Sequence, residues 1–297
     1  MEQTLIAPAK VNLFLHLIGQ NTAGYHRLES LFSFTNFGDV INFKKADSWG
    51  FQCVGPFSKT LTELGAAGDD NLCMKMARSF YGFVSKNSQV EAYPVEIRLE
   101  KNLPIAAGIG GGSSDAAAAL VALNTLWQVG LTLEELAKFS LKLGADIPAC
   151  VHQTPCFVEG VGDIITPLTG LKDQHIVLAN PLSSLSTPLA FKAFHTLRGK
   201  FHSSLMGGWV DDYRSSPKEF LQRQSNDLDA AACHLVPEIG PLLHDISELS
   251  GCWLSRMSGS GATCFGLFDG ADQATEAVSE LQRKYPTYWM QKGILHG

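Results

Sequence analysis

Alternating apolar and polar positions predict strands in the first third of the chain. Val11, Leu13, Leu15 and Leu17 occupy every second position, which is the period of a strand in a sheet. Residues 28–37, 39–43 and 95–99 are rich in the apolar and aromatic residues that strands favour. We therefore expect a sheet that begins near the N-terminus.

Three stretches of the same half have the signals of helices instead. Residues 72–84 follow a polar sequence at 69–71 that supplies a helix cap. Residues 115–127 are dominated by alanine and leucine, which are strong helix formers. Thr132 and Glu135 have the spacing of a capping box, so we expect a helix that opens there and ends at Gly144.

The second half of the chain also mixes both kinds of element. Strands are expected at residues 157–161, 176–179, 253–257 and 263–268, and helices at residues 191–197, 235–249 and 272–285. Residues 199–224 mix glycine, serine, proline and charge, and no element is assigned to them. Strands and helices occur in both halves without regular alternation, so the expected fold class is α+β.

Composition and charge narrow the classes of protein. With 297 residues, 45% hydrophobic and 18% charged, the chain has the balance of a globular protein, and its length suggests two domains or lobes. A net charge of −6 without a basic run argues against a nucleic-acid partner. Seven cysteines without a Cys-x-x-Cys pair favour reduced thiols in a cytoplasm over disulfides or structural zinc. No apolar run suits a membrane span or a secretion signal.

A glycine-rich loop at residues 104–114 is the strongest candidate for a binding site. Gly108, Gly110, Gly111 and Gly112 let backbone N–H groups approach a ligand, and the serines at 113 and 114 open the helix that follows. Backbone donors at a helix N-terminus favour an anion, so the loop is a candidate phosphate site. It matches neither a Walker A loop nor a Rossmann fingerprint, and a tight turn without a ligand is the alternative.

Three further segments add candidate chemistry. Lys10 lies in an apolar strand, although an ordinary surface lysine is the alternative. Asp146 follows Gly144 among apolar neighbours, where a carboxylate could accept a hydroxyl proton or only cap a turn. Residues 257–266 form a second glycine cluster, which is either a turn packed close to the first loop or the rest of a phosphate pocket.

In order along the chain, these four segments resemble the motifs of the GHMP small-molecule kinase superfamily. The resemblance extends from Ala7 to Gly266 and includes the sequence Pro-x-x-x-Gly-x-Gly-Gly-Gly-Ser-Ser. It implies a two-lobed α+β fold, with an ATP-binding lobe at residues 1–155, a substrate-side lobe at residues 156–297 and an active site in the cleft between them. It also implies transfer of the ATP γ-phosphate to a hydroxyl group. Mg²⁺ is expected beside ATP, although the sequence contains no acidic cluster that would indicate its ligands.

The resemblance also implies roles for individual residues. Asp146 would take the hydroxyl proton, and Lys10 would hold Asp146 and stabilise developing charge. The sequence Gly24-Tyr25-His26 resembles members whose small-molecule substrate carries a cytidine diphosphate group, with Tyr25 and Phe191 sandwiching cytosine and His26 binding its edge. Weaker candidates for the polar parts of the substrate are Asn12, Thr187 and Lys192. ATP would be bound by Asn71 and Lys101 near its nucleoside and by Pro104, Ile105, Ala106, Ala107, Gly108, Ile109, Gly110, Gly111, Gly112, Ser113 and Ser114 around its phosphates.

Other functions stay open on the sequence alone. Homoserine, mevalonate or sugar kinases would keep the glycine loop but would have no reason for the set at Tyr25, His26 and Phe191. A diphosphate decarboxylase of the same fold would release carbon dioxide. A nucleotide-responsive binding module would not need Lys10 and Asp146 together. The oligomeric state is not indicated.

Overall fold

The chain forms two compact units that exchange segments. The computed structural model describes residues 2–87, 90–169, 171–205 and 209–297. Unit 1 contains Met1–Ala9, Phe37–Ile105 and Gly110–Gln153, and unit 2 contains Lys10–Asn36, Ala106–Ile109 and Thr154–Gly297. The division near residue 153 lies close to the expected boundary at residue 155, but residues 10–36 and 106–109 group with unit 2. The reason is that the long strands β1 (Glu2–Gln20) and β2 (His26–Lys45) contribute to both units.

The strands of unit 1 lie around the second half of β2. Strand β4 (Val95–Glu100) pairs antiparallel with residues 40–45 of β2 and parallel with β3 (Gly50–Val54). Strand β1 pairs with β2 on the other side. A Cβ at Gly38 would lie 1.9 Å from the carbonyl oxygen of Ala7, so only glycine permits this close approach of β1 to β2.

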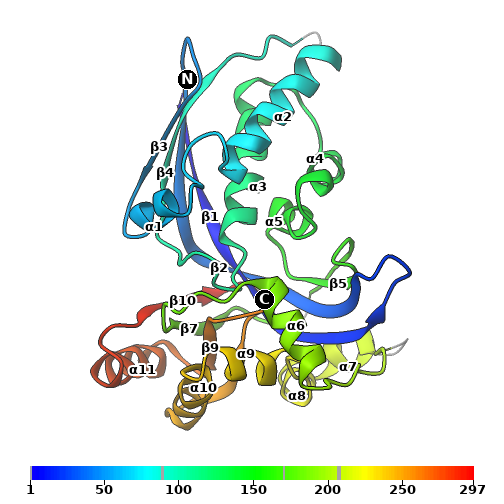
Figure 1. Ribbon diagram of the computed structural model, residues 1–297, viewed down its shortest axis with the longest axis vertical. Helices are drawn as coiled ribbons and strands as arrows, with labels where there is room; N and C mark the ends of the chain where they lie inside the picture. Colours follow the sequence, from blue (N-terminus) through cyan, green and yellow to red (C-terminus); the bar gives the residue numbers. More distant parts are fainter. Residues whose placement is uncertain (1, 88–89, 170, 206–208) are drawn as a thin grey trace. The chain divides into compact units, whose positions relative to one another are not determined.

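The helices of unit 1 lie beside these strands, where α1 contacts β3 and the others pack against one another (Figure 1). They are α1 (Ser58–Glu63), α2 (Leu72–Asn87), α3 (Gly111–Leu126), α4 (Leu133–Ser140), the 3₁₀ helix η1 (Leu141–Leu143) and α5 (Ile147–His152). Helix α3 is the centre of the group, because α2, α4 and α5 all contact it. Its leucines at 120 and 123 are fully buried. The capping box predicted at Thr132 and Glu135 is present at the start of α4.

Unit 2 is built on antiparallel strands. Strand β5 (Cys156–Gly160) pairs with residues 28–32 of β2 and with β6 (Ile164–Pro167). The other strands are ordered β10 (Trp289–Leu295), β7 (Gln174–Asn180), β9 (Cys264–Phe268) and β8 (Cys252–Met257). The end of β10 returns to β2, where Leu295 pairs with Thr35.

Six helices complete the described part of unit 2. They are α6 (Thr187–Thr196), α7 (Trp209–Ser215), α8 (Pro217–Arg223), α9 (Asp229–Leu235), α10 (Ile239–Glu248) and α11 (Ala271–Lys284). Helix α10 packs on β8 and β9, and α11 packs on β7, β9 and β10. Together with α6 and α9 they enclose an apolar core that includes Val177, Leu242, Ile246 and Phe268.

The mixture of helices and strands confirms the expected α+β class, but several local expectations were wrong or incomplete. The helix expected at residues 235–249 is α10, which begins only at Ile239 because Pro237 has no N–H group and separates it from α9, a helix that was not expected. Residues 199–224 contain α7 and α8, and β10 was not expected at all. Strands β3 and β6 and helices α1 and α5 were not expected either, and the strands expected at residues 28–37 and 39–43 are the single strand β2. The boundaries of the other elements differ from the expectation by a few residues, as at α2 and α11.

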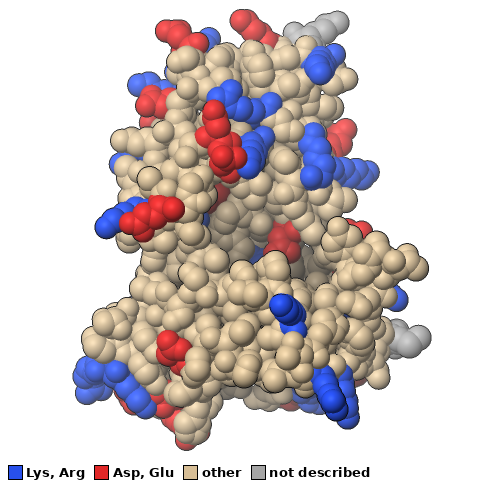
Figure 2. All heavy atoms as spheres, in the orientation of Figure 1, with Lys and Arg blue, Asp and Glu red and all other residues tan. Residues whose placement is uncertain are grey.

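The surface and the thiols agree with the composition. On the face drawn in Figure 2, acidic and basic side chains are interspersed and neither sign forms a continuous patch. All seven cysteines are free of disulfides. Among the helices of the described residues, none is long and apolar enough to cross a membrane.

Candidate active site

The glycine-rich loop turns through left-handed conformations before it becomes helix α3. Gly108 and Gly110 have φ values of +75° and +63°, and Gly110 is the N-cap of α3. Glycine adopts these conformations without a steric penalty. The loop is shared by the two units, since residues 106–109 group with unit 2 and residues 110–114 with unit 1.

In unit 2, the first half of the loop is packed against the second glycine cluster. Ser258 Oγ donates a hydrogen bond to the carbonyl oxygen of Gly108 at 2.9 Å and accepts one from Asn12 N at 3.0 Å. Thr263 N donates to the carbonyl oxygen of Ala107 at 3.1 Å. A Cβ at Gly108 would lie 2.3 Å from the carbonyl oxygen of Ser258. The cluster at residues 257–266 is thus a turn that supports the loop backbone directly.

Lys10 belongs to the same assembly and is not a surface lysine. Its side chain lies in a strand whose residues are buried, and Lys10 as a whole is 4% exposed. The ammonium lies 4.1 Å from the centroid of the Phe32 ring, within range of a cation–π interaction. Its backbone N–H donates to the carbonyl oxygen of Ile109 at 2.9 Å, so β1 is fastened to the loop. The alternative of an ordinary surface lysine is therefore wrong.

Asn12 lies two residues further along β1, and one of its side-chain polar atoms has no hydrogen-bond partner among the described residues. Its Nδ2 donates to Ser30 Oγ at 2.9 Å, while its buried Oδ1 has no hydrogen-bond partner in the structure. A buried acceptor without a partner is costly, and a ligand that donates a hydrogen bond would remove that cost. The expected role of Asn12 toward a polar substrate stays a prediction.

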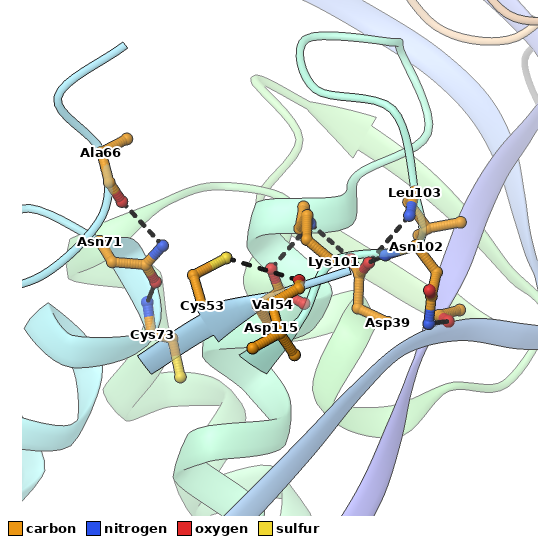
Figure 3. Close-up of polar contacts among 11 residues, drawn as sticks. Asp39, Cys53, Val54, Ala66, Asn71, Cys73, Lys101, Asn102, Leu103 and Asp115 are labelled. Carbon is orange, nitrogen blue, oxygen red and sulfur yellow. Dashed lines mark hydrogen bonds and ion pairs between the residues drawn. The ribbon is translucent and has the colours of Figure 1, made fainter. Parts of the chain in front are cut away.

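In unit 1, a buried cluster of three charges lies under the second half of the loop (Figure 3). Lys101 Nζ is paired with Asp39 and with Asp115, the latter at 2.9 Å, and all three residues are at most 3% exposed. Asp39 Oδ1 also accepts hydrogen bonds from the backbone N–H groups of Asn102 and Leu103, at 2.6 and 2.9 Å. A Cβ at Gly111 would lie 3.1 Å from Lys101 Nζ, so the helix start rests on this cluster.

Burial and ion pairing shift the pKa values of Lys101 and Asp115 in opposite directions. Burial disfavours the Lys101 ammonium, but the carboxylates of Asp115 and Asp39 outweigh it and raise the pKa of Lys101. Burial raises the pKa of Asp115 to about 8, against the opposing effect of Lys101 and with a further rise from Asp39. Burial therefore outweighs the pairing with Lys101 at Asp115 and favours the protonated form of its carboxyl near neutral pH.

The other residues of unit 1 that were expected in the site differ in burial and in hydrogen bonding. Asn71 uses both ends of its amide within the chain, accepting from Cys73 N at 2.9 Å and donating to the Ala66 carbonyl at 3.0 Å. Ser114 is fully buried and its Oγ has no hydrogen-bond partner, while Gly112 is exposed. Asp146 occupies the N-cap position of α5 but makes no capping hydrogen bond, so the alternative of a helix cap is not realised.

In unit 2, the residues expected to bind the base are partly assembled. The rings of His26 and Phe191 are stacked, with centroids 4.4 Å apart. Tyr25 is 68% exposed, and its ring has no aromatic partner among the described residues. Thr187 Oγ1 lies 2.8 Å from Ser260 Oγ of the second glycine cluster, and Lys192 is exposed on α6. The stack of His26 on Phe191 joins two segments that are far apart in sequence.

The expected pair of Lys10 and Asp146 is divided between the units, so its contact stays a prediction. Two acidic residues of the site, Asp39 and Asp115, were not identified as site residues from the sequence. The position of Asp115 in a helix otherwise made of alanine and leucine was an available signal, because a carboxylate on such a buried face needs a partner. Asp39 gave no such signal, since its partners are supplied only by the fold.

Family models and relatives classify the chain. The model described as the GHMP kinases N terminal domain matches residues 71–154, and the model described as GHMP kinases C terminal matches residues 219–287. The class of protein is therefore that of the GHMP kinases. The matched segments contain the glycine loop with Asp146 and the second glycine cluster with β8 and β9.

Relatives narrow this class to one activity. Proteins of Agrobacterium fabrum and Cereibacter sphaeroides named 4-diphosphocytidyl-2-C-methyl-D-erythritol kinase are 42% and 41% identical over 95% and 96% of this chain, and over 93% and 96% of their own lengths. A solved 4-(cytidine 5'-diphospho)-2C-methyl-D-erythritol kinase has a TM-score of 0.78 at 30% identity, covering 99% of this chain and 100% of its own. A solved homoserine kinase from Cytophaga hutchinsonii shares the fold, with a TM-score of 0.74 at 15% identity over 99% of this chain and 94% of its own. The chain belongs to the 4-diphosphocytidyl-2-C-methyl-D-erythritol kinase family.

Proposed function

We propose that the protein transfers the γ-phosphoryl group of ATP to the 2-hydroxyl of 4-diphosphocytidyl-2-C-methyl-D-erythritol, giving the 2-phosphate and ADP, in the non-mevalonate route to isoprenoid precursors. The observation that carries the proposal is the identity of about 40% to kinases of this name over nearly the whole chain. The buried Lys10, the loop fixed in left-handed turns and the stacked His26 and Phe191 are the features that such a reaction would use.

Phosphoryl transfer requires mainly positioning and charge stabilisation from the protein. The backbone N–H groups of residues 108–114 would hold the ATP phosphates at the N-terminus of α3. Asp146 would accept the proton of the 2-hydroxyl as that oxygen attacks the γ-phosphorus, and ADP would leave with the bridging oxygen. Lys10 would stabilise the negative charge that develops on the transferred group.

Recognition of the substrate would lie in unit 2. Tyr25 and Phe191 would bind the faces of cytosine, His26 its edge, and Asn12, Thr187 and Lys192 the polar parts of the rest. Asn71 and Lys101 were expected near the nucleoside of ATP. Because the Lys101 ammonium is engaged by the side chains of Asp39 and Asp115, we propose that it supports the loop beneath ATP.

Mg²⁺ is expected with ATP because it neutralises charge on the β- and γ-phosphates. The part of the chain that the structure describes holds no group of three His, Cys, Asp or Glu side chains suited to a metal ion. Asp39 and Asp115 beside the loop are engaged by Lys101. Within the described residues, carboxylates therefore form no cluster of three for this ion, which would be held mainly by the phosphates of ATP. The cytoplasmic location stays a prediction.

A coupled assay for ADP across a panel of alcohols, with and without a cytidine diphosphate group, tests the proposal. Turnover should be confined to the alcohol that carries cytidine diphosphate. Equal use of the free alcohol would support a generic alcohol kinase, release of carbon dioxide would support a decarboxylase, and nucleotide binding without ADP formation would support a binding module. Tyr25→Ala should weaken the cytidine substrate by about 1–3 kcal/mol, the range for a base stacked on an aromatic ring, with the KM for ATP unchanged.

A further inference from the structure

A second histidine is paired with His26. The Nε2 atoms of His26 and His195 lie 2.7 Å apart. At this distance one nitrogen carries a proton and donates it to the other, which must be bare. Gln20 Nε2 lies 3.3 Å from the His26 nitrogen and 3.4 Å from that of His195, so a side-chain amide from the end of β1 flanks the pair.

Helix α6 places His195 for this contact. His195 follows Phe191 by four residues, and residues at this spacing lie on the same face of a helix one turn apart. Phe191 stacks on His26, and His195 hydrogen-bonds the edge of the same ring. One helix therefore restrains both the plane and the rotation of the His26 imidazole.

The segment 199–205, to which the sequence gave no role, supplies a third contact. The ring centroid of Phe201 lies 6.4 Å from that of His26 and 6.2 Å from that of His195. Phe201 is 44% exposed, so it covers the pair from a solvent-facing side. Both histidines are thus bordered by an aromatic ring that comes from outside the family motifs.

Buried anchors fix this segment to β1 and β2. Glu29 is 2% exposed and accepts hydrogen bonds from Ser204 Oγ and, at 2.9 Å, from Leu205 N. His202 N donates to the carbonyl oxygen of Leu17 at 2.7 Å, and the His202 ring stacks on His16 with centroids 3.9 Å apart. A buried carboxylate satisfied by one short loop holds that loop in place, because leaving it unpaired would be costly.

We propose that His195 is a positioning residue for base recognition, which fixes the tautomer and orientation of the His26 imidazole, with Phe201 held beside the pair by the anchored segment 199–205. The inference rests on the proposed function, because His26 has a base to recognise only if the substrate carries cytosine. A hydrogen bond to one ring nitrogen decides whether the other donates or accepts. A ring already held in position also loses less conformational freedom when the substrate binds.

Fixing the tautomer has a consequence for selectivity. Cytosine presents an amino donor and a ring-nitrogen acceptor where uracil presents an acceptor and a donor. A histidine restricted to one tautomer can satisfy only one of these patterns, and the mismatched base leaves polar groups unpaired. His195 therefore contributes to discrimination between cytidine and uridine forms of the substrate without touching either.

The test compares His195→Phe, which keeps a ring and removes the hydrogen bond, with His195→Gln, whose amide can replace it. His244→Phe makes the first change at an exposed histidine of α10 and serves as the control. For each full-length variant the KM for the cytidine substrate, the KM for ATP, kcat, Tm and the ratio of kcat/KM for cytidine and uridine substrates are measured.

We expect His195→Phe to raise the KM for the cytidine substrate about three- to tenfold, the range for one net hydrogen bond, and to lower the cytidine preference. The KM for ATP and Tm should match the control, and His195→Gln should recover the KM to within about twofold of wild type. Phe201→Ala should raise the same KM by a smaller factor.

An unchanged KM in His195→Phe would overturn the proposal, as would a parallel rise in the KM for ATP or a failure of His195→Gln to recover. An unchanged KM in Phe201→Ala would overturn the role of the segment 199–205. These results are distinct from failure of the proposed function, which would show as equal use of the alcohol that lacks cytidine diphosphate by the wild-type enzyme.

Discussion

Removal of the Lys101 ammonium is the most direct perturbation of the charge cluster beneath the loop. Lys101→Met keeps the length and the apolar stem of the side chain but leaves Asp39 and Asp115 without a cation. Both carboxylates are almost fully buried. Asp115 loses little at pH 7, because its pKa of about 8 already keeps it mostly protonated. The cost therefore falls on Asp39, whose buried side chain loses its ion-pair partner.

Breaking a buried ion pair by removing one partner costs about 3–5 kcal/mol. The two backbone N–H groups that bind Asp39 Oδ1 still stabilise its charge, which places the expected loss at the lower end of this range. In the double variant with Asp39→Asn, the amide oxygen can accept the same two hydrogen bonds without carrying a charge. We expect the double variant to recover about 1–2 kcal/mol of the loss, because neutralising both partners avoids an unpaired buried charge.

Urea unfolding at pH 7, followed by circular dichroism, gives the free energy of unfolding for wild type, both single variants and the double variant. Asp39→Asn alone is the matched control, because it disturbs the pair from the other side. A loss below about 1 kcal/mol in Lys101→Met would refute the ion-pair reasoning. So would a double variant less stable than Lys101→Met, since the removed carboxylate would then not have been the source of the cost.

Three further perturbations test other parts of the site. Asp146→Asn should lower kcat by about 10²-fold or more with little change in the KM for ATP, and near-normal steady-state turnover would exclude Asp146 as the base. Gly108→Ala should lower the free energy of unfolding by at least about 1 kcal/mol and weaken ATP binding in calorimetry. The reason is that the φ of Gly108 is +75° and the new Cβ would lie 2.3 Å from the Ser258 carbonyl oxygen. Unchanged ATP affinity would argue against a phosphate loop. Because the pKa of Asp115 is raised to about 8, the folded state binds more protons than the unfolded chain, so stability should fall as pH rises toward 8. Asp115→Asn should flatten that fall between pH 6 and pH 9 in urea unfolding, and equal slopes in both proteins would contradict it.

The sequence predicted elements wherever the signal was local. The polar start at Asn71 is a cap, since its Oδ1 accepts from Cys73 N, and the capping box at Thr132 opens α4. The alternation in β1 and the glycine loop before α3 were equally local, because period and turn chemistry are written within a few residues. The break at Pro237 was also local and was overlooked.

Long-range partners could not be predicted in the same way. The pairing of Lys101 with Asp39 joins residues 62 positions apart, and the hydrogen bond between Glu29 and Leu205 joins residues 176 positions apart. Neither partner is implied by the residues around the other. The expected roles of Lys10, Asp146 and Tyr25 came from the family resemblance and stay predictions, whereas the burial of Lys10 and the stacking of His26 on Phe191 required the fold.

The sharing of β1 and β2 between the units has a consequence during synthesis on the ribosome. Thr35 of β2 pairs with Leu295, about 260 residues later in the chain. At roughly 5–20 residues per second, that partner emerges roughly 10–50 seconds after Thr35 has been made. During this interval the edge of β2 that β10 will meet lacks its permanent partner, and its unpaired backbone groups are open to pairing with another chain. Unit 2 becomes complete only when β10 has left the exit tunnel and paired with β7, so a nascent chain truncated before β10 is an aggregation hazard rather than a smaller folded protein.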